Sequence, residues 1–164
     1  MQSEPTIVID TREKHPIVFP PRLATRHGTL RTGDYSVDGF LDCFTVERKS
    51  LADLVNTVIH DRERFERELE RMRSYEFRRI LVTAPFERVA RGPYPHSRAN
   101  PKSVLASLAV FEVRYGVPIV FAKDEKEAAE RILIWIHYFV REKGLETRRN
   151  VPRMPPVASE PLGT

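Results

Sequence analysis

The chain has 164 residues, of which 41% are hydrophobic and 30% charged, and its formal net charge is +4. This length suits one domain with a substantial core and is short for two. No apolar stretch is long enough to span a membrane, and residues 1–6 lack the pattern of a signal peptide. We therefore expect a soluble intracellular protein, in the cytoplasm or nucleoid if its source is prokaryotic or a phage, without a membrane partner.

The scarce residue types exclude several kinds of site. A single cysteine cannot form an internal disulfide, and the five histidines show no spacing typical of zinc ligands. A bound metal should therefore have oxygen ligands, and no other small-molecule cofactor is expected. The positive charge suits a polyanionic partner, although alone it is weak evidence.

The first predicted element is a short buried strand at residues 6–10, which ends on Asp10 before a polar turn. An acid at the end of a strand is well placed for a site. Prolines at positions 16, 20 and 21 then argue against long regular structure.

A hairpin is predicted for residues 29–49, with Asp38-Gly39 as its two-residue turn. In the simplest register Asp34 faces Cys43, which is about four residues short of Glu47. A bulge, a shifted turn or a wider loop near the glycine would bring the two acids together.

Helices and strands alternate in the remainder. The predicted elements are, in order, a helix opened by Ser50, a charged helix at residues 61–77, a strand at 79–84, a basic loop at 85–101, a helix from Asn100 and Pro101 to Tyr115, a strand at 117–122, and a helix from Asp124 to about Lys143 before Gly144. The proline-containing tail has little to bury and is predicted to be disordered, which gives a domain at residues 1–144 and a tail at 145–164. This order predicts a three-layer α/β/α sandwich with a central mixed β-sheet.

The segment VERKSLADL, residues 46–54, carries acidic and basic residues that favour metal-dependent chemistry on a phosphate. On a strand Glu47 and Lys49 point the same way. The carboxylate can hold a hard divalent cation against a phosphate, while the lysine positions water or neutralises charge, as in metal-dependent phosphodiesterases. An isolated E-x-K is more often an exposed strand pair, and Asp53 taken alone is more often a helix cap.

Four motifs follow one another along the chain: IDTRE at residues 9–13, GDY at 33–35, VERKSLAD at 46–53 and Arg64-Phe65 in the charged helix. Together, and in this order, they resemble the nuclease domain of the XPF-type structure-specific endonucleases, a branch of the PD-(D/E)XK nuclease fold. The resemblance covers roughly residues 6–143. It implies a restriction-endonuclease-like fold.

The resemblance also implies a metal site. The implied metal ligands are Asp10, Asp34, Glu47 and the backbone carbonyl of Arg48, and the implied catalytic residues are Asp34, Glu47, Arg48, Lys49 and Asp53. Lys49 would orient or activate water, and Asp53 would hold Lys49, Arg48 or a metal-bound water. Converging carboxylates repel one another unless a cation is present, which independently favours Mg²⁺, with Mn²⁺ able to substitute.

DNA contacts are expected from basic and aromatic residues. The resemblance implies that Arg12, Arg48 and Arg64 contact phosphate or brace the acids. In the basic loop, the candidates are Arg88, Arg91 and Arg98 for the DNA backbone and Tyr94 for stacking on an unpaired base. A solvated loop without a DNA role explains these residues nearly as well.

The last predicted helix carries an apolar run at residues 132–140 that is wider than one buried stripe needs. Either the helix is fully buried or one face meets a partner. Because XPF-type nuclease domains commonly pair, the resemblance favours a homodimer with Trp135, Tyr138 and Phe139 at its interface.

The leading hypothesis is a Mg²⁺-dependent endonuclease that cuts DNA near junctions of double and single strands, such as flaps, forks or branches. One alternative is a non-catalytic DNA-binding or scaffold domain, and another is a nuclease of the same fold that acts on plain duplex DNA. Better-known members carry a tandem helix-hairpin-helix domain after the nuclease, whereas this chain ends soon after Gly144. The motifs therefore predict phosphodiester cleavage more strongly than they predict a preferred DNA shape.

Overall fold

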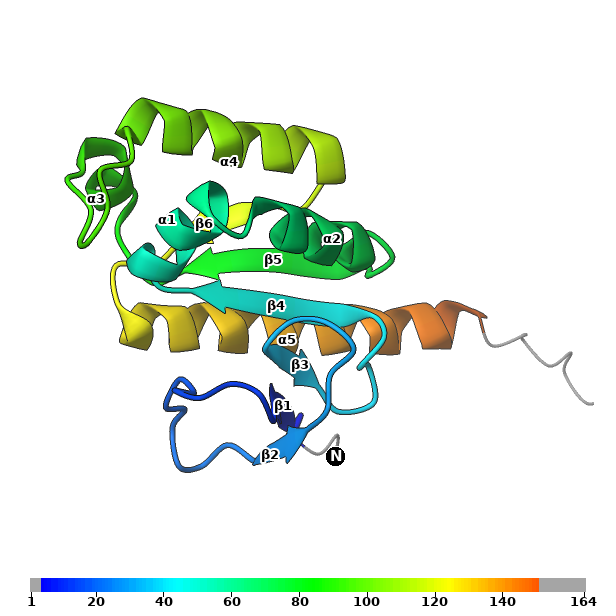
Figure 1. The fold of residues 1–164 in the computed structure, drawn as a ribbon. Coiled ribbons are helices and arrows are strands. Elements are labelled where there is room, and N and C mark those ends of the chain that lie inside the picture. Colours follow the sequence, from blue (N-terminus) through cyan, green and yellow to red (C-terminus); the bar gives the residue numbers. More distant parts are fainter. Residues whose placement is uncertain (1–3, 151–164) are drawn as a thin grey trace, which may run out of the picture.

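The computed structural model describes residues 4–150, which form a six-stranded sheet between two helical layers (Figure 1). The strands are β1 (Ile7–Asp10), β2 (Thr25–Gly28), β3 (Tyr35–Val37), β4 (Phe44–Lys49), β5 (Phe77–Val82) and β6 (Ile119–Phe121). Their order is β2-β1-β3-β4-β5-β6, in which β3 runs antiparallel to β1 and β4 while the other pairs are parallel. The predicted α/β/α sandwich with a mixed sheet is confirmed.

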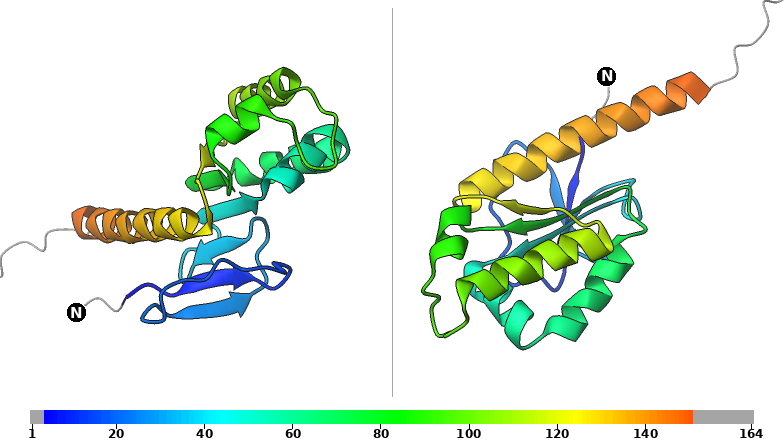
Figure 2. Two further views of the ribbon diagram at one scale, coloured as in Figure 1. Left: turned by 90° about the vertical axis from the view of Figure 1, so that its left-hand side faces the viewer. Right: turned by 90° about the horizontal axis from the view of Figure 1, so that it is seen from above.

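The helices divide between the two faces of the sheet, as Figure 2 shows. They are α1 (Leu51–Ile59), α2 (Arg62–Met72), α3 (Phe86–Arg91), α4 (Pro101–Tyr115) and α5 (Glu125–Asn150). Leu54, Leu69 and Phe111 of α1, α2 and α4 pack in one core with β5, while Ile132 and Ile136 of α5 pack in a second core with β1, β3 and β4. Helices α1, α2 and α4 cover the half of the sheet formed by β4, β5 and β6. They therefore leave room for a cleft over β1 and β3.

Helix ends follow the predicted capping signals. The Ser50 hydroxyl accepts the N–H of Asp53 over 3.1 Å at the start of α1, and the Asn100 side chain accepts the N–H of Lys102 over 2.9 Å at the start of α4. Gly116, with φ +62°, ends α4 in the left-handed conformation. These boundaries were predictable because short polar side chains at such positions satisfy amides that the helix leaves unpaired.

Two elements were not predicted. β2 has a polar sequence without apolar alternation, and it forms because it pairs in parallel with the buried strand β1. α3 lies in the predicted basic loop; no side chain caps its start, and only Val89 is buried. Neither segment carries the periodic signal on which sequence interpretation depends.

The predicted helix end at Gly144 is wrong, because α5 continues to Asn150. One glycine inside a helix costs only about 1 kcal/mol relative to alanine, and its neighbours here are good helix formers. Residues 151–164, the rest of the predicted tail, lie outside the described residues. No helix in residues 4–150 is long and apolar enough to cross a bilayer.

Candidate active site

The two faces of β4 carry different parts of the VERK motif. Lys49 and Glu47 share one face, with 3.1 Å between Nζ and Oε1. The Arg48 side chain points to the other face, where it donates to the His15 carbonyl over 2.8 Å and pairs with Glu125 at the start of α5. The prediction that this side chain acts in catalysis is therefore corrected: strand alternation turns it away from the site, and it braces β4 against α5.

Asp34 lies beside Glu47 because the hairpin has a wider loop than the predicted two-residue turn. Residues 38–43 form that loop, and Tyr35 pairs with Val46 in antiparallel register. The N–H of Asp34 donates to the Val46 carbonyl over 2.9 Å. This register replaces the predicted pairing with Cys43 and brings the two acids together.

The backbone of Arg48 faces the site even though its side chain does not. Its N–H donates to Asp34 Oδ2 over 2.9 Å. Successive peptide groups of a strand point to opposite sides, so the Arg48 carbonyl lies on the same edge as this N–H. The Lys49 carbonyl accepts the N–H of Thr83 over 2.9 Å on the other edge. The carbonyl that the resemblance implies as a metal ligand therefore lies on the edge next to Asp34.

Gly33 determines how the chain reaches Asp34. Its φ is +82°, and a Cβ added there would lie 2.0 Å from Thr45 Oγ1. The Thr45 hydroxyl donates to the Thr32 carbonyl over 2.9 Å, which holds this loop against β4. Only glycine satisfies both the backbone conformation and the space, which gives the GD pair a physical basis.

Asp10, at the end of β1, is saturated by four hydrogen bonds. Oδ1 accepts from Arg12 N and Nε at 2.9 and 2.7 Å, and Oδ2 accepts from Arg12 Nη2 and Leu30 N at 3.1 and 2.7 Å. Burial raises the pKa of Asp10, but these bonds outweigh it and hold the pKa below the ordinary value. A carboxylate offers about four lone-pair positions, so none remains for a metal. The predicted metal role of Asp10 is corrected to a brace for the loop before Asp34.

α2 contributes Glu68, which sequence interpretation missed, and Phe65, which belongs to a predicted motif but was given no role in the site. Glu68 lines the site and shares a side-chain hydrogen bond with Glu47. Phe65 is 2% exposed, and its ring centroid lies 5.0 Å from Lys49 Nζ, within cation–π range. The spacing of Arg64 and Glu68 at i and i+4 was a signal, but α2 has too many charged residues for spacing alone to select them.

Burial and repulsion raise the pKa values of the paired acids. Burial raises the pKa of Asp34 from 3.8 to about 6; the N–H of Arg48 opposes the shift, and Glu13 and Glu68 add to it. Burial, followed by the charges of Asp34 and Glu68, raises the pKa of Glu47 well above its ordinary value. Burial lowers the pKa of Lys49, but Glu47 and Glu68 outweigh that effect and raise it. A proton or a cation would relieve the excess negative charge.

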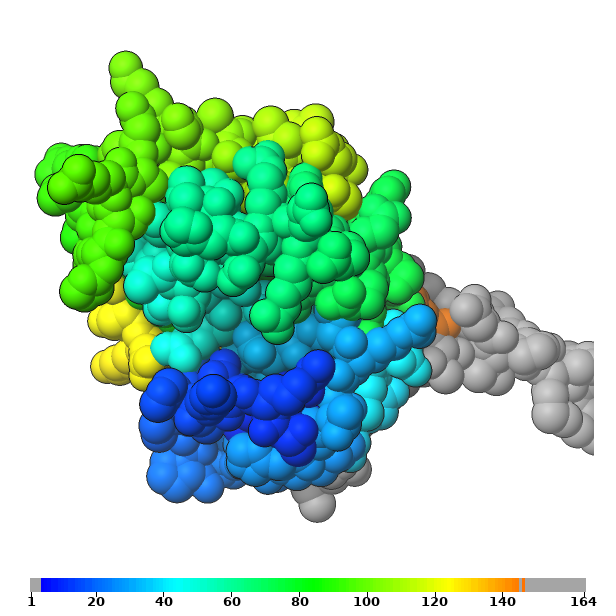
Figure 3. All heavy atoms as spheres, viewed as in Figure 1, coloured from blue at the N-terminus to red at the C-terminus, as the bar shows by residue number. Residues whose placement is uncertain are grey.

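A cleft of about 400 Å³ contains these groups, between α1 and α2 on one side and the N-terminal loops on the other. In Figure 3 it follows the boundary between the blue N-terminal segment and the cyan and green helices. The predicted residues that line it are Asp10, Arg12, Asp34, Glu47, Arg48, Lys49, Asp53 and Arg64. Arg31 and Arg71, which were not predicted, line it as well.

Asp53 lines the cleft as the partner of Ser50. The Ser50 hydroxyl donates to Asp53 Oδ2 over 2.7 Å and accepts the N–H of Asp53. The structure thus gives Asp53 the capping role, and Lys49 is held by Glu47 instead. The bond from Asp53 to Lys49 or Arg48 that the resemblance implies is absent among the residues described.

The donor set fits a hard cation that keeps most of its waters. Within residues 4–150, no group of three or more His, Cys, Asp or Glu side chains is placed to hold a metal ion. Mg²⁺ in proteins is usually bound through one or two carboxylates and retains several waters, so a full protein cage is not needed. Asp34, Glu47 and the carbonyl of Arg48 are oxygen donors of this kind, and their surplus charge favours a cation.

The predicted basic loop does not join the cleft. Tyr94 is 5% exposed and donates its hydroxyl hydrogen bond to the Val89 carbonyl over 2.5 Å, so the prediction that it stacks on a base is wrong. Arg88 donates to the Pro93 carbonyl over 2.7 Å and stabilises the loop. Arg91 and Arg98 are exposed but do not line the cleft.

The three aromatic residues predicted for a dimer interface differ in exposure. Trp135 and Phe139 are partly buried and contact Phe77, with ring centroids 5.5 and 6.2 Å away. Tyr138 is 54% exposed, as is its neighbour on the same face, Ile134, at 56%. Trp135 and Phe139 therefore pack against the sheet with part of their surface, and their place in a dimer interface stays a prediction.

The family model of the ERCC4 domain matches residues 9–134. A protein of Methanocaldococcus jannaschii that is named as an ATP-dependent RNA helicase is 30% identical over 129 residues, which cover 77% of this chain. The chain spans 15% of the length of that protein.

Two solved structures share the fold. XPF from Aeropyrum pernix is 24% identical with a TM-score of 0.67, and the match covers 98% of this chain and 70% of that one. XPF from the same organism in complex with DNA is 24% identical with a TM-score of 0.61, and the match covers 93% of this chain and 76% of that one. The mixed sheet with helices on both faces is thus the fold of an XPF nuclease domain.

Proposed function

The chain belongs to the ERCC4 domain family, and we propose that it acts as an XPF-type nuclease domain. From this premise we propose that it is a Mg²⁺-dependent endonuclease that hydrolyses DNA near junctions of double and single strands. The observation that carries the proposal is the pair formed by Asp34 and Glu47 across β3 and β4, with Lys49 on the face of Glu47. The DNA complex of Aeropyrum pernix XPF supports DNA as the substrate.

The residues of the site suggest a division of work. Bound Mg²⁺ would neutralise charge on the scissile phosphate and lower the pKa of water, and Mn²⁺ is expected to substitute. Asp34, Glu47 and the Arg48 carbonyl are the groups that would hold it. Lys49 is fixed between Glu47 and the ring of Phe65. Its ammonium is placed to orient the attacking water or to stabilise the developing charge on the phosphate.

The wall of the cleft suggests how the phosphate is held. The Arg12 side chain is 66% exposed although it is bonded to Asp10, so it can brace that acid and still face the solvent. Arg64 precedes Phe65 on α2, which places it one residue from the ring under Lys49. We assign phosphate contacts to these two arginines.

Cleavage of three DNAs by purified protein tests the function. Flap, fork and plain duplex substrates are incubated with Mg²⁺, Mn²⁺ or chelator, beside Lys49→Ala and Asp34→Asn. We expect metal-dependent cutting of the flap and fork by the wild type and none by either variant. No cutting of any substrate would indicate the non-catalytic alternative, and equal cutting of plain duplex would indicate a nuclease without structural preference.

We also propose that the protein is a homodimer that pairs through the outer face of α5. Ile134 and Tyr138 are separated by one helical turn and are both exposed, so they form an apolar strip that water does not favour. Light scattering at micromolar concentration should give twice the chain mass, and Ile134→Asp with Tyr138→Asp should halve it. The matched control is Val113→Asp on α4, where Val113 is 87% exposed. A wild-type mass of one chain contradicts the dimer.

A further inference from the structure

Three arginines that line the cleft are not engaged by the protein. Within the part of the chain that the structure describes, the side chains of Arg31, Arg64 and Arg71 make no hydrogen bond or ion pair. The Arg12 side chain also lines the cleft but is paired with Asp10, and the Arg48 side chain lies on the other face of β4, where it is paired with Glu125. Unpaired guanidiniums around an acidic floor are cations available to an anionic ligand.

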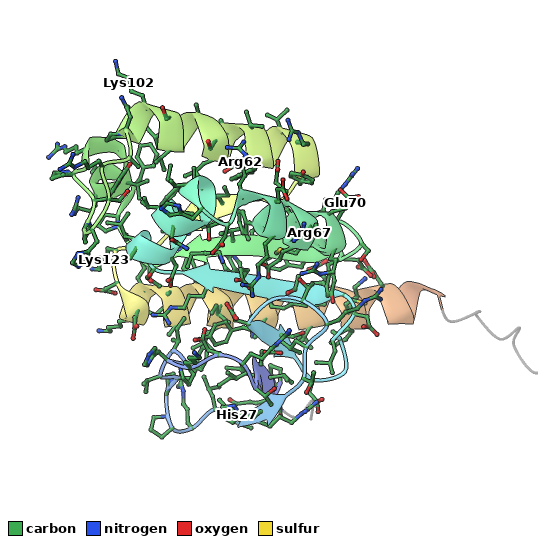
Figure 4. The ribbon with its side chains drawn as sticks, in the orientation of Figure 1. His27, Arg62, Arg67, Glu70, Lys102 and Lys123 are labelled. Atoms are coloured by element: carbon green, nitrogen blue, oxygen red, sulfur yellow. The ribbon has the colours of Figure 1, made fainter. Side chains whose placement is uncertain are left out.

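α2 fixes the spacing of two of these cations. Arg64, Glu68 and Arg71 stand at positions i, i+4 and i+7, so they share the helix face that borders the cleft. Arg64 and Arg71 are separated by two turns, about 10 Å along the helix axis. Arg62, by contrast, is turned toward α4, where it donates to Ser107 over 3.0 Å (Figure 4). The helix therefore presents cations at two separate points of one wall.

Arg31 and Arg71 come from different parts of the chain, and both interact electrostatically with Tyr75. Tyr75, just after α2, is 3% exposed, and its hydroxyl has no hydrogen-bond partner among the described residues. Burial raises the pKa of Tyr75 and Asp42 adds to the rise, whereas Arg31 and Arg71 both oppose it. Both guanidiniums line the cleft, and both lower the pKa of the same buried hydroxyl.

We propose that Arg31 and Arg71 form a subsite for a phosphate of the DNA backbone that neighbours the scissile phosphate. The subsite deepens the proposed nuclease function and rests on it. A strand that enters the cleft meets the carboxylates of Asp34, Glu47 and Glu68, which repel phosphate. Cations on the wall offset this repulsion, so the strand follows α2 from Arg64 at the end nearest Lys49 to Arg71 at the other end.

DNA binding without cutting tests the subsite. Fluorescence anisotropy of a labelled flap DNA in chelator compares the wild type with Arg31→Ala/Arg71→Ala over a range of salt concentrations. We expect the double variant to bind about tenfold more weakly, because hydrogen bonds to charged groups contribute on the order of one factor of ten. The slope of log affinity against log salt should fall by about one for the lost phosphate contact.

Two controls separate the subsite from general effects of charge or folding. Arg73→Ala removes an arginine two residues away that is paired with Glu70, and it should leave affinity and salt slope unchanged. Arg31→Lys/Arg71→Lys keeps the charge and should restore most of the affinity. Thermal unfolding of each variant verifies the fold.

The possible results distinguish the subsite from the nuclease function. Unchanged affinity and salt slope in a folded Arg31→Ala/Arg71→Ala protein overturn the subsite, and so does an equal loss in Arg73→Ala. If the wild type fails to cut DNA in Mg²⁺ while the double variant still loses affinity, the nuclease function fails and the anion subsite stands. If the wild type cuts and the variant binds as well as the wild type, only the subsite fails.

Discussion

Asp34 and Glu47 are buried acids, and burial disfavours their charged forms. The folded-state pKa of Asp34, about 6, is above its ordinary value of 3.8, so the folded protein binds this proton more tightly than the unfolded chain does. The contribution of Asp34 to the stability of the metal-free protein should therefore be most favourable below about pH 4, decrease as the pH rises to about 6, and stay at its lowest above that.

A substitution of Asp34 tests this linkage. Asp34→Asn removes the charge and retains an acceptor for the N–H of Arg48, so in chelator at about pH 8 it should stabilise the protein by about 1–3 kcal/mol. The advantage should decrease below about pH 6 and disappear by about pH 3, where the wild-type acid is protonated in both states. Unfolding midpoints measured across this range provide the test. If the variant is less stable than the wild type at the higher pH, the buried charge of Asp34 does not destabilise the folded protein, which contradicts the prediction.

Arg48 and Lys49 are neighbours in sequence with different expected roles. The Arg48 side chain is 12% exposed and joins β4 to α5 through its ion pair with Glu125. Arg48→Ala removes this ion pair and should lower the free energy of unfolding by about 1–3 kcal/mol. At temperatures where it remains folded, it should cut DNA at a rate near that of the wild type. Lys49→Ala should keep most of the stability and lose cutting. Equal loss of cutting in folded samples of both variants would contradict this separation.

At the scale of elements, the turn into β3 depends on one glycine. Gly33→Ala forces a Cβ to within 2.0 Å of Thr45 Oγ1 at φ +82°, so we expect a loss of several kcal/mol, roughly 3 or more, and a displaced Asp34. Gly39→Ala is a matched control, because Gly39 has φ +85° with nothing within 4 Å of the added Cβ. It should cost only about 1 kcal/mol, for the backbone conformation. Denaturant unfolding measures both, and equal losses would contradict the steric account.

The elements also indicate which part of the site could be predicted from sequence. The shared face of Glu47 and Lys49 follows from strand alternation, and the start of α1 follows from the capping of Ser50. The register that joins Asp34 to Glu47 could not be fixed, because loop length sets it and residues 38–43 carry a plausible shorter turn signal.

Residues that depend on tertiary contacts escaped prediction. Tyr94 was assigned to DNA because its segment is basic, yet packing against α3 buries it. Glu68 and Arg71 have no local signal that distinguishes them from the other charged residues of α2, and only the packing of α2 beside β4 brings them to the cleft. Asp10 was placed correctly near the site, but its saturation by Arg12 and Leu30 required coordinates.

At the scale of the whole molecule, the sheet separates support from chemistry. α5 covers one face and contributes Glu125, which holds Arg48, while the opposite face carries Glu47 and Lys49. The central strand β4 thus has its structural contacts on one side and its reactive groups on the other. A dimer formed through α5 would leave the cleft open to DNA.

The central claim is that Asp34 and Glu47 together hold the divalent cation. Calorimetric titration of Mn²⁺ into chelator-stripped protein at about pH 8, where both acids gain most from a cation, tests it most directly. We expect saturable binding by the wild type and by Asp10→Asn and Asp53→Asn, and loss of that binding in Asp34→Asn and Glu47→Gln. Binding that is unchanged in Asp34→Asn, or that is lost only in Asp10→Asn, would contradict the claim.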